Sequence, residues 1–436
     1  MKSAPFLIPC AWIFLMSWLL VVNSRGAVAK TLSIIESGAV GDSRTTNTVA
    51  IQRAIDRLAL EGGGTLTVPK GNFLTGSIFL KPGVDLHLEK GCVLMGSTNI
   101  ADYPPMPTRI EGHTQVWRPA LVNASGCDHL RIRGEGMIRG GGAPFWKAFW
   151  TRFRADNSVR NLDVDRPRNI FISDSSDVGI SGISLRDSGF WNLHLFRCRG
   201  VTVDHVDIRT PPGSPSTDGI DIDSCSNVTV RNSYISVDDD DIALKGNKGP
   251  ESDRDEGIPP VEHILVTGCT FGLGQGVVTL GSEATHVRDV TVEDCTVEYR
   301  EKSSNVLARF KLRPDTPQHY EDIRFRNIRM DSKGSLITIK PWTQYFDLKG
   351  KAAPSQLVEN VKLSNITGRM TSFGKIFPPP NGVIRNLTLA DIDLHLSDPK
   401  VTVEGVADLT FTNVTINGKP VLPPDSMKNG TSSVAK

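Results

Sequence analysis

The chain has 436 residues, of which 39% are hydrophobic, so it can bury a large core in one elongated domain or in two or three compact ones. Its formal charge at pH 7 is +1. A nearly neutral chain has no global field that would attract nucleic acid or an anionic membrane surface, so any anionic ligand must be held by local charges.

The first 29 residues have the features of an export signal. Lys2 precedes an apolar stretch over 11–22, and Ala27-Val28-Ala29 forms a small-x-small cleavage site. We therefore expect a signal peptide over 1–29 and a secreted mature chain that begins near Lys30. An uncleaved anchor is the alternative, but the apolar stretch is short for a bilayer span. No later segment is long and apolar enough to cross a membrane, so no stable membrane association is expected.

An amphipathic helix is predicted close to the start of the mature chain. Between 49 and 60, Ile51, Ile55 and Leu58 repeat at helical spacing after Thr46 or Asn47, either of which can cap a helix. Three glycines over 62–64 end the segment. Because these glycines follow the helix, where a phosphate-binding loop would precede it, no nucleotide site is predicted.

An internal repeat dominates the second half of the chain. The pattern h-x-h-x-x-h-x-h, in which h is apolar, recurs every 22 to 38 residues and begins at Val178, Val201, Val228, Ile264, Val290, Ile323, Val361, Leu387 and Leu409. Each h-x-h half is typical of a short strand, and the extra residue between the halves indicates a bend. The fifth position supports the bend, because Gly, Asn and Asp tolerate the left-handed backbone of a sharp corner. Its residues are Gly182, His205, Asn232, Gly268, Asp294, Asn327, Asn365, Asp391 and Asn413.

Stacked repeats share one interior that a single repeat cannot form, and their variable spacing places insertions in external loops. We therefore predict a single-domain right-handed parallel β-helix over 30–420, closed at its N-terminal end by the helix over 49–60 and followed by a C-terminal tail over 421–436. Cys269 and Cys295 share the inward sixth position and are expected to be stacked core thiols. Six cysteines follow the signal, and their disulfide pairing stays open.

Carboxylates begin two equivalent predicted strands that lie 22 residues apart. The segment 218–222 aligns with 240–244, which places Asp218 and Asp240 on neighbouring coils about 4.8 Å apart, with Asp239 beside them. Such crowding yields one protonated and one ionised carboxyl, which is what glycosidic hydrolysis requires. A solvated turn or a calcium site is the alternative. Asp221 and Asp223 alternate within a strand and are expected to face solvent.

A pair of cations follows further along the chain. Arg309 and Lys311 are separated by one residue, so they point to the same side of a strand and can together hold a carboxylate. The sequence is equally compatible with an alternative, in which Arg309 and Lys311 are surface residues neutralised by Asp or Glu.

Four blocks in this order resemble the polygalacturonase family of pectin-degrading glycoside hydrolases, family 28. They are Ser216-Thr217-Asp218-Gly219, Asp239-Asp240, Gly274-Gln275-Gly276 and Arg309-Phe310-Lys311, within a resemblance that runs from about 34 to 394. The resemblance implies an inverting hydrolysis of α-linked galacturonate without metal or cofactor, with Asp239 as general acid and with Asp218 and Asp240 activating water. It also implies that Arg309, Lys311, Gln275 and Tyr345 contact substrate, with Trp342 and Gln344 lining the same groove. The expected partner is a polysaccharide, and the expected state is a monomer.

The sequence departs from the family pattern at two positions. Ser216 replaces the usual Asn, and Gln275 replaces the usual His, whose titratable proton an amide cannot supply. Gly281-Ser282-Glu283 and Lys340-Pro341-Trp342 resemble the divergent branches, which often cut at chain ends. A rhamnogalacturonan hydrolase, a non-catalytic carbohydrate-binding β-helix and a calcium-dependent pectate lyase are the alternatives.

Overall fold

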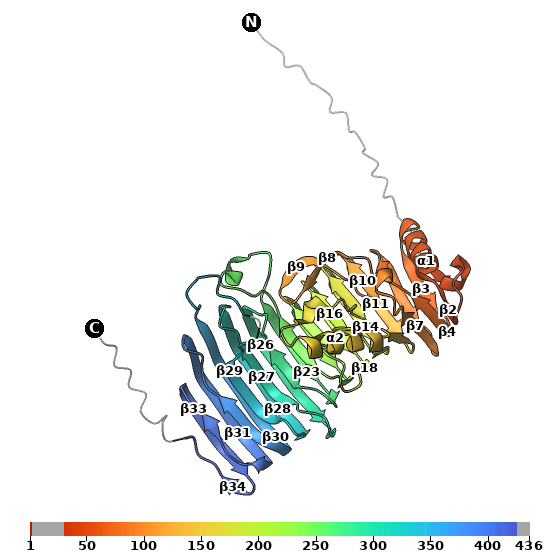
Figure 1. Cartoon of the computed structure of the whole chain (residues 1–436). Helices are drawn as coiled ribbons and strands as arrows, with labels where there is room; N and C mark the ends of the chain where they lie inside the picture. The colour runs from red at the N-terminus through yellow and green to blue at the C-terminus, as the bar shows by residue number, and fades with distance from the viewer. Residues whose placement is uncertain (2–29, 345, 425–436) are drawn as a thin grey trace.

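The computed structural model describes Met1, residues 30–344 and residues 346–424. Within this part of the chain, 32 strands join into one sheet that winds from the N-terminal to the C-terminal end of an elongated molecule (Figure 1). Almost all strand pairs are parallel, and each strand pairs with strands of the coils before and after it. The predicted right-handed parallel β-helix is confirmed.

Three stacks of strands form the faces of the coil. The first contains β1 (Thr31–Ser33), β3 (Gly64–Val68), β6 (Val84–Leu88), β11 (Arg131–Gly134), β14 (Ser176–Ser181), β17 (Arg199–Asp204), β20 (Ser226–Arg231), β23 (Val261–Thr267), β26 (His286–Val297), β28 (Gln318–Asp331), β30 (Gln356–Ile376), β31 (Gly382–Asp398) and β33 (Val406–Ile416). The second contains β2 (Asp42–Thr46), β4 (Gly71–Thr75), β7 (Cys92–Gly96), β12 (Met137–Arg139), β15 (Ser184–Arg186), β18 (Asp207–Arg209), β21 (Tyr234–Ser236) and β24 (Thr270–Phe271), which pairs with β26. The third contains β5 (Ile78–Leu80), β10 (Val122–Ser125), β13 (Ile170–Ser173), β16 (Leu193–Phe196), β19 (Ile220–Asp223), β22 (Ile242–Lys245), β25 (Gly276–Leu280), β27 (Val306–Leu312) and β29 (Ser335–Pro341), which pairs with β30. The short strand β32 (Thr402–Val403) pairs with β30, and β34 (Lys419–Pro420) folds back antiparallel on β33.

The corner predicted at the fifth repeat position is present in every copy. All nine residues have a left-handed backbone, with φ between 51° and 74°. His205, the one residue outside the Gly, Asn and Asp set, adopts φ 52° like the others. Asn and Asp side chains also connect successive corners, as in the hydrogen bond from Asn365 Nδ2 to Asn327 Oδ1 at 3.0 Å. Corners of successive coils are therefore joined by side-chain hydrogen bonds.

One continuous apolar cluster fills the interior of the coil from Leu32 to Ile416. The six described cysteines are free thiols, without disulfide bonds, and are buried in this cluster. Cys269 and Cys295 lie on paired strands one coil apart, as predicted, because Thr270 pairs with Thr296. The coil thus gains its stability from apolar burial shared along the whole stack.

Helix α1 (Thr48–Leu60) covers the N-terminal opening of the coil with Ile51, Ala54, Ile55 and Leu58, all fully buried (Figure 1). Asn47 stands at the N-cap position, but its side chain does not cap the helix. Its Oδ1 accepts from the Val40 N–H at 2.7 Å instead, and its Nδ2 donates to the carbonyl oxygens of Thr45 in β2 and Leu74 in β4. The predicted cap position is therefore correct for Asn47, but no capping hydrogen bond forms, because tertiary contacts compete for the same amide.

Two further elements lie outside the coil and were not predicted. The hairpin of β8 (Met106–Ile110) and β9 (His113–Trp117) and helix α2 (Ala143–Ala155) are insertions on the outer surface. No helix among the described residues is long and apolar enough to span a bilayer. The predicted signal, except Met1, and the predicted tail beyond 424 lie outside the described residues.

Candidate active site

Asp218 and Asp240 precede equivalent strands of successive coils. Ile220 of β19 pairs with Ile242 of β22, so the two carboxylates occupy matching positions, in the register predicted from their spacing. The Gly219 N–H donates to the Asp240 carbonyl oxygen at 2.9 Å, which ties the two turns together. Asp218 is 4% exposed and Asp240 is fully buried. Two acidic side chains are therefore held close together with little water around them.

Asp239 lies in the turn between β21 and β22, and its Oδ1 accepts from the Asp240 N–H at 3.0 Å. Burial, followed by repulsion from Asp218 and Asp240, raises the pKa of Asp239 to about 7, although Lys311 and Arg309 act in the opposite direction. A carboxyl group with this pKa keeps its proton in mildly acidic and near-neutral solution. Asp239 is thus suited to donate a proton.

Asp240 has the opposite environment. Its Oδ2 lies 2.6 Å from Lys311 Nζ and its Oδ1 lies 2.7 Å from Arg309 Nη1. Burial would raise the pKa of Asp240, but the two cations outweigh it and hold the pKa well below its usual range. For Asp218, burial prevails over Lys245, whose Nζ is 3.4 Å from Asp218 Oδ2, and the pKa is raised. Two adjacent carboxyls, Asp239 and Asp240, therefore differ in charge near neutral pH.

Arg309 and Lys311 lie on β27 and point to the same side, as the sequence predicts. Both face the Trp342 ring, whose centroid is 5.4 Å from the Arg309 guanidinium carbon and 4.7 Å from Lys311 Nζ. Both cations form ion pairs with Asp240. The alternative prediction, in which an acidic residue neutralises the two cations, therefore also describes this pair. Tyr345, predicted to contact substrate, lies outside the described residues.

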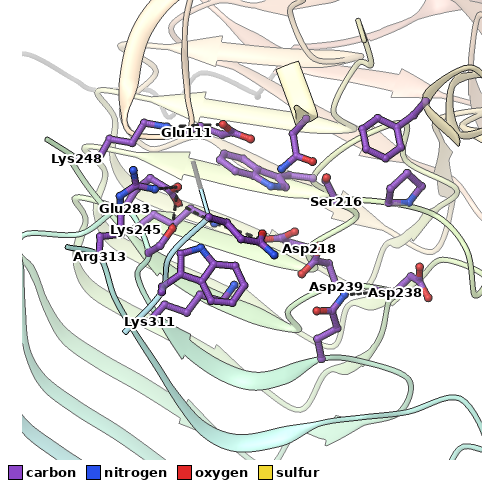
Figure 2. A pocket seen from close by; sticks show the side chains of 18 of the residues that line it. Glu111, Ser216, Asp218, Asp238, Asp239, Lys245, Lys248, Glu283, Lys311 and Arg313 are labelled. Carbon is purple, nitrogen blue, oxygen red and sulfur yellow. Dashed lines mark hydrogen bonds and ion pairs between the residues drawn. The ribbon is translucent and has the colours of Figure 1, made fainter. Parts of the chain in front are cut away.

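A cavity of about 340 Å³ opens beside these carboxylates. Its lining comes from coils and insertions and includes Glu111, Phe149, Trp150, Phe153, Asn161, Trp191, Pro215, Ser216, Asp218, Asp238, Asp239, Lys245, Lys248, Gln275, Ser282, Glu283, Lys311, Arg313, Trp342 and Gln344. Figure 2 shows Asp218 and Asp239 at one end and Lys248, Glu283 and Arg313 at the other. The cavity therefore offers carboxylates for chemistry and, separately, charged groups that can bind substrate.

Gln275 lies beside the candidate acid. Its Nε2 donates to the Asp238 carbonyl oxygen at 3.2 Å, and its backbone N–H donates to the Asp239 carbonyl oxygen at 3.0 Å. Gln275 can therefore hold the turn that carries Asp239, although its amide cannot exchange a proton with the carboxyl group.

Gly276 occupies the position of Asp240 in the next coil, because Ile242 pairs with Val278. A Cβ at Gly276 would lie 2.3 Å from Thr279 Oγ1, 2.8 Å from Asp240 Oδ1 and 3.0 Å from Arg309 Cδ. The absence of a side chain here leaves room for the ion pair between Asp240 and Arg309.

The expectation that Asp221 and Asp223 face solvent is wrong. Both are fully buried, and the β8–β9 hairpin contributes to the cover of Asp223. Arg109 of this hairpin binds Asp223 through Nε at 2.9 Å and Nη2 at 3.2 Å. Asp221 lies 3.5 Å from Lys245 Nζ, and burial, with repulsion from Asp218, raises its pKa well above the ordinary value. Strand alternation assigns these residues to the outer face but does not show that an insertion covers it.

Lys245 is the central residue that sequence reasoning missed. Its ammonium group lies 3.4 Å from Asp218, 3.5 Å from Asp221 and 3.7 Å from Glu283, and 4.6 Å from the Trp191 ring centroid. Burial disfavours its charge, but these carboxylates prevail and raise its pKa well above the ordinary value. Lys245 is the last residue of β22, the strand that directly follows the acidic block around Asp240. This position is a signal in the sequence that could have identified Lys245 as a site residue.

The outer rim of the cavity was missed as well. Phe149, Trp150 and Phe153 line it from α2, and Glu111 lines it from the turn of the β8–β9 hairpin, where Lys248 Nζ lies 3.7 Å from Glu111 Oε2. The aromatic residues at 145, 149 and 153 repeat at helical spacing, which is a signal that could have revealed α2.

Comparisons with known proteins identify the family. The profile of the glycosyl hydrolases family 28 matches residues 62–414. A probable polygalacturonase of Vitis vinifera is 32% identical over 61% of this chain and 54% of its own length, so this match spans about half of that relative. An exopolygalacturonase of Zea mays is 28% identical over 82% of this chain and 83% of its own length.

Solved structures agree with the fold. An exopolygalacturonase from Thermotoga maritima has a TM-score of 0.72 and 23% identity over 89% of this chain and 92% of its own. The polygalacturonase of Erwinia carotovora has a TM-score of 0.67 and 21% identity over 89% of this chain and 97% of its own. At these identities the likeness concerns the fold alone. The family predicted from the four blocks is confirmed by the profile, which covers most of the chain: the protein belongs to family 28 of the glycosyl hydrolases and is a glycoside hydrolase.

Proposed function

We propose that this enzyme hydrolyses α-glycosidic bonds in galacturonate-containing polysaccharide, pectin or polygalacturonate, with inversion at the anomeric carbon. The observation that carries the proposal is the contrast between Asp239, whose pKa is raised to about 7, and Asp240, whose pKa two cations hold low. An inverting glycosidase needs one carboxylic acid for the leaving oxygen and one carboxylate for the attacking water.

In the proposed step, Asp239 gives its proton to the glycosidic oxygen as the bond to the anomeric carbon breaks. A water molecule attacks that carbon from the opposite face and loses its proton to the Asp218 and Asp240 pair. The products are a free hydroxyl on the leaving sugar and an inverted hemiacetal. The ion pairs of Asp240 with Arg309 and Lys311 keep this base charged before the reaction.

The charges of the cavity support a uronate substrate. Lys311 uses one of its three donors on Asp240, and Arg309 uses one of five, so both retain donors for a sugar carboxylate. Lys248 lines the cavity and lies 3.7 Å from its nearest carboxylate oxygen, that of Glu111. The names of the grapevine and maize relatives, a probable polygalacturonase and an exopolygalacturonase, favour the same substrate class.

We further propose that the enzyme acts at chain ends. A polymer that is cut internally must run past the catalytic carboxylates in both directions, whereas here α2 and the β8–β9 turn add walls to the cavity through Phe149, Trp150, Phe153 and Glu111. In a viscosity assay, chain-end cutting should release reducing ends with little early loss of viscosity. A rapid early loss of viscosity would reject this part of the proposal.

The main test is incubation of the purified protein with polygalacturonate in the presence of a chelator, followed by product analysis. We expect saturated products, and proton NMR at early times should show the anomer opposite to the substrate linkage. Calcium-dependent unsaturated ends would indicate a lyase. Binding without cleavage would support the non-catalytic alternative suggested by Gln275 in place of His, and cleavage of rhamnogalacturonan alone would identify a different substrate.

We also propose that the predicted signal over 1–29 directs export of the protein from the cell.

A further inference from the structure

A second cluster of chemically active side chains lies on the first stack of strands, outside the cavity. His286 of β26 pairs with His319 of β28, and two residues later Glu321 of β28 pairs with Glu359 of β30. Figure 1 shows these strands side by side. Because paired residues of parallel strands stack directly, the two imidazole rings are parallel within 5°, with centroids 5.0 Å apart.

One carboxylate faces both imidazoles. Glu321 Oε1 lies 2.9 Å from His286 Nε2, and Glu321 Oε2 lies 3.6 Å from His319 Nε2. One possible ligand atom from each of these three residues lies within 4.8 Å of the other two. His319 Nε2 is also 2.8 Å from Glu359 Oε1, so a second carboxylate borders this group. Two imidazole nitrogens and one carboxylate therefore converge on one location, with Glu359 beside it.

Two arginines near this cluster bind carboxylates other than Glu321. Arg288, which pairs with Glu321 in the sheet register, donates instead to Glu262 at 2.7 Å. Arg385 lies 2.7 Å from Glu359 Oε2, the oxygen that faces away from His319, and so holds that carboxylate in place. Oriented carboxylates of this kind support metal ligands in proteins.

From this geometry we propose that His286, His319 and Glu321 bind one divalent transition-metal ion of the zinc type, with Glu359 or water as a fourth ligand. Imidazole nitrogen together with carboxylate oxygen is a ligand set of zinc, whereas calcium and magnesium take oxygen ligands. In a tetrahedral site with zinc bonds of about 2.1 Å, ligand atoms lie roughly 3.4 Å apart. The three ligand atoms lie within 4.8 Å of one another, so side-chain rotations that draw them closer would complete the site.

The ion can reach the site from solvent. The side chains of His286 and His319 are 32% and 37% exposed, and both line a surface hollow of about 620 Å³ that shares no lining residue with the catalytic cavity. The site would join β26 and β28, two successive strands of the first stack, and Glu359 as fourth ligand would add β30. Because the unfolded chain does not bring these residues together, binding should raise the unfolding temperature.

Other histidines provide matched controls. His129, His205 and His263 each pair with a single aspartate, at 2.7, 2.7 and 2.8 Å. His263 is 53% exposed and bonds to Asp289 alone among the described carboxylates, so it offers a histidine and an acid without a second imidazole. His263→Ala therefore removes an imidazole without touching the proposed site.

The test uses the full-length protein without a histidine tag or substrate, titrated with zinc chloride by calorimetry and with cobalt(II) as a spectroscopic probe. We expect one ion per chain, the intense visible bands of four-coordinate cobalt and a zinc-dependent rise in unfolding temperature. His286→Ala, His319→Ala and Glu321→Gln should each weaken binding by at least roughly tenfold, whereas His263→Ala should leave it unchanged.

Three outcomes would overturn the proposal. The first is an absence of stoichiometric binding by the parent protein, and the second is equal affinity in the three variants, each shown by circular dichroism to be folded. The third is loss of binding in Asp240→Asn but not in His286→Ala, which would place the ion at the catalytic carboxylates. The inference does not depend on the proposed reaction, because its readouts are binding, cobalt spectra and unfolding temperature.

Discussion

Replacement of Lys311 by Met tests whether the charge of Asp240 depends on its cationic partners. The change keeps most of the side-chain length but removes the ammonium group 2.6 Å from Asp240 Oδ2. At an effective dielectric constant of about 20, unit charges at this distance attract by roughly 6 kcal/mol, before the cost of removing both groups from water is subtracted. An opposite charge beside a carboxyl typically shifts its pKa by about one to three units, or roughly 1.4 to 4 kcal/mol.

We therefore expect the pKa of Asp240 to rise by about one to three units in Lys311→Met, with Arg309 retaining part of the effect. In the parent enzyme the pKa of Asp240 lies well below the usual range, so the proposed base is already ionised in mildly acidic solution. In the variant the acidic limb of the pH profile should move upward. The alkaline limb should move upward too, because Lys311 also lowers the pKa of Asp239.

The sign of the stability change follows from the same pKa. A carboxyl group with a lowered pKa in the folded state stabilises the protein above its unfolded pKa of about 3.9, and this contribution disappears as the pH falls through the folded value. Lys311→Met should therefore unfold more easily at neutral pH, by at most about 3 to 5 kcal/mol, with a smaller difference in strong acid.

The assay is the pH dependence of kcat/KM on polygalacturonate, with carbon-13 NMR titration of the aspartates as a check that does not need activity. Lys340→Met is the matched control, because Lys340 pairs with Lys311 in the register of the next coil but is exposed. If the acidic limb and the Asp240 titration move no more in Lys311→Met than in Lys340→Met, the argument for a cation-held base is refuted.

Three other substitutions and one pH dependence test the remaining parts of the site and the fold. Asp239→Asn should lower kcat by roughly 10² to 10⁴ with little change in KM, because the amide cannot protonate the leaving oxygen; an unchanged rate would reject Asp239 as the acid. In the parent enzyme, activity should fall as the pH rises through about 7, where Asp239 loses its proton, and a profile that stays flat there would reject the same assignment. Gly276→Ala should reduce kcat and cost about 1 to 3 kcal/mol, because its Cβ would meet Thr279 and Asp240; calorimetry and kinetics would detect both effects, and a crystal structure with Asp240 undisplaced would contradict the reason given. Ile222→Ala should lower the free energy of unfolding in urea by about 2 to 5 kcal/mol, since Ile222 is fully buried in the coil, and a cost near zero would contradict shared core packing.

The coil was readable from the sequence because the same local rule applies in every turn. Apolar alternation and a left-handed corner recur together, and even His205, which breaks the residue pattern, takes the predicted backbone. The positions of Asp218 and Asp240 followed from the same rule, since strand register alone sets which residues of successive coils are neighbours.

What the sequence did not reveal depends on insertions, which follow no repeat. The burial of Asp223 requires Arg109, 114 residues earlier in the chain, and strand periodicity carries no information about this contact. The aromatic wall of α2 likewise became a part of the site only once the coil positioned the helix beside it. The partner of Lys311 was ambiguous for a similar reason, because its contact with Asp240 spans 71 residues of sequence.

The strand register has a consequence for how such enzymes diversify. The separation of Asp218 and Asp240 is fixed by one coil step, which no change of loop length alters. The hairpin with Glu111 and the segment with Trp342 leave the coil between strands, so they can lengthen, shorten or change composition without moving those two carboxylates. Changes in these insertions can therefore reshape the cavity while the register of the two carboxylates stays the same.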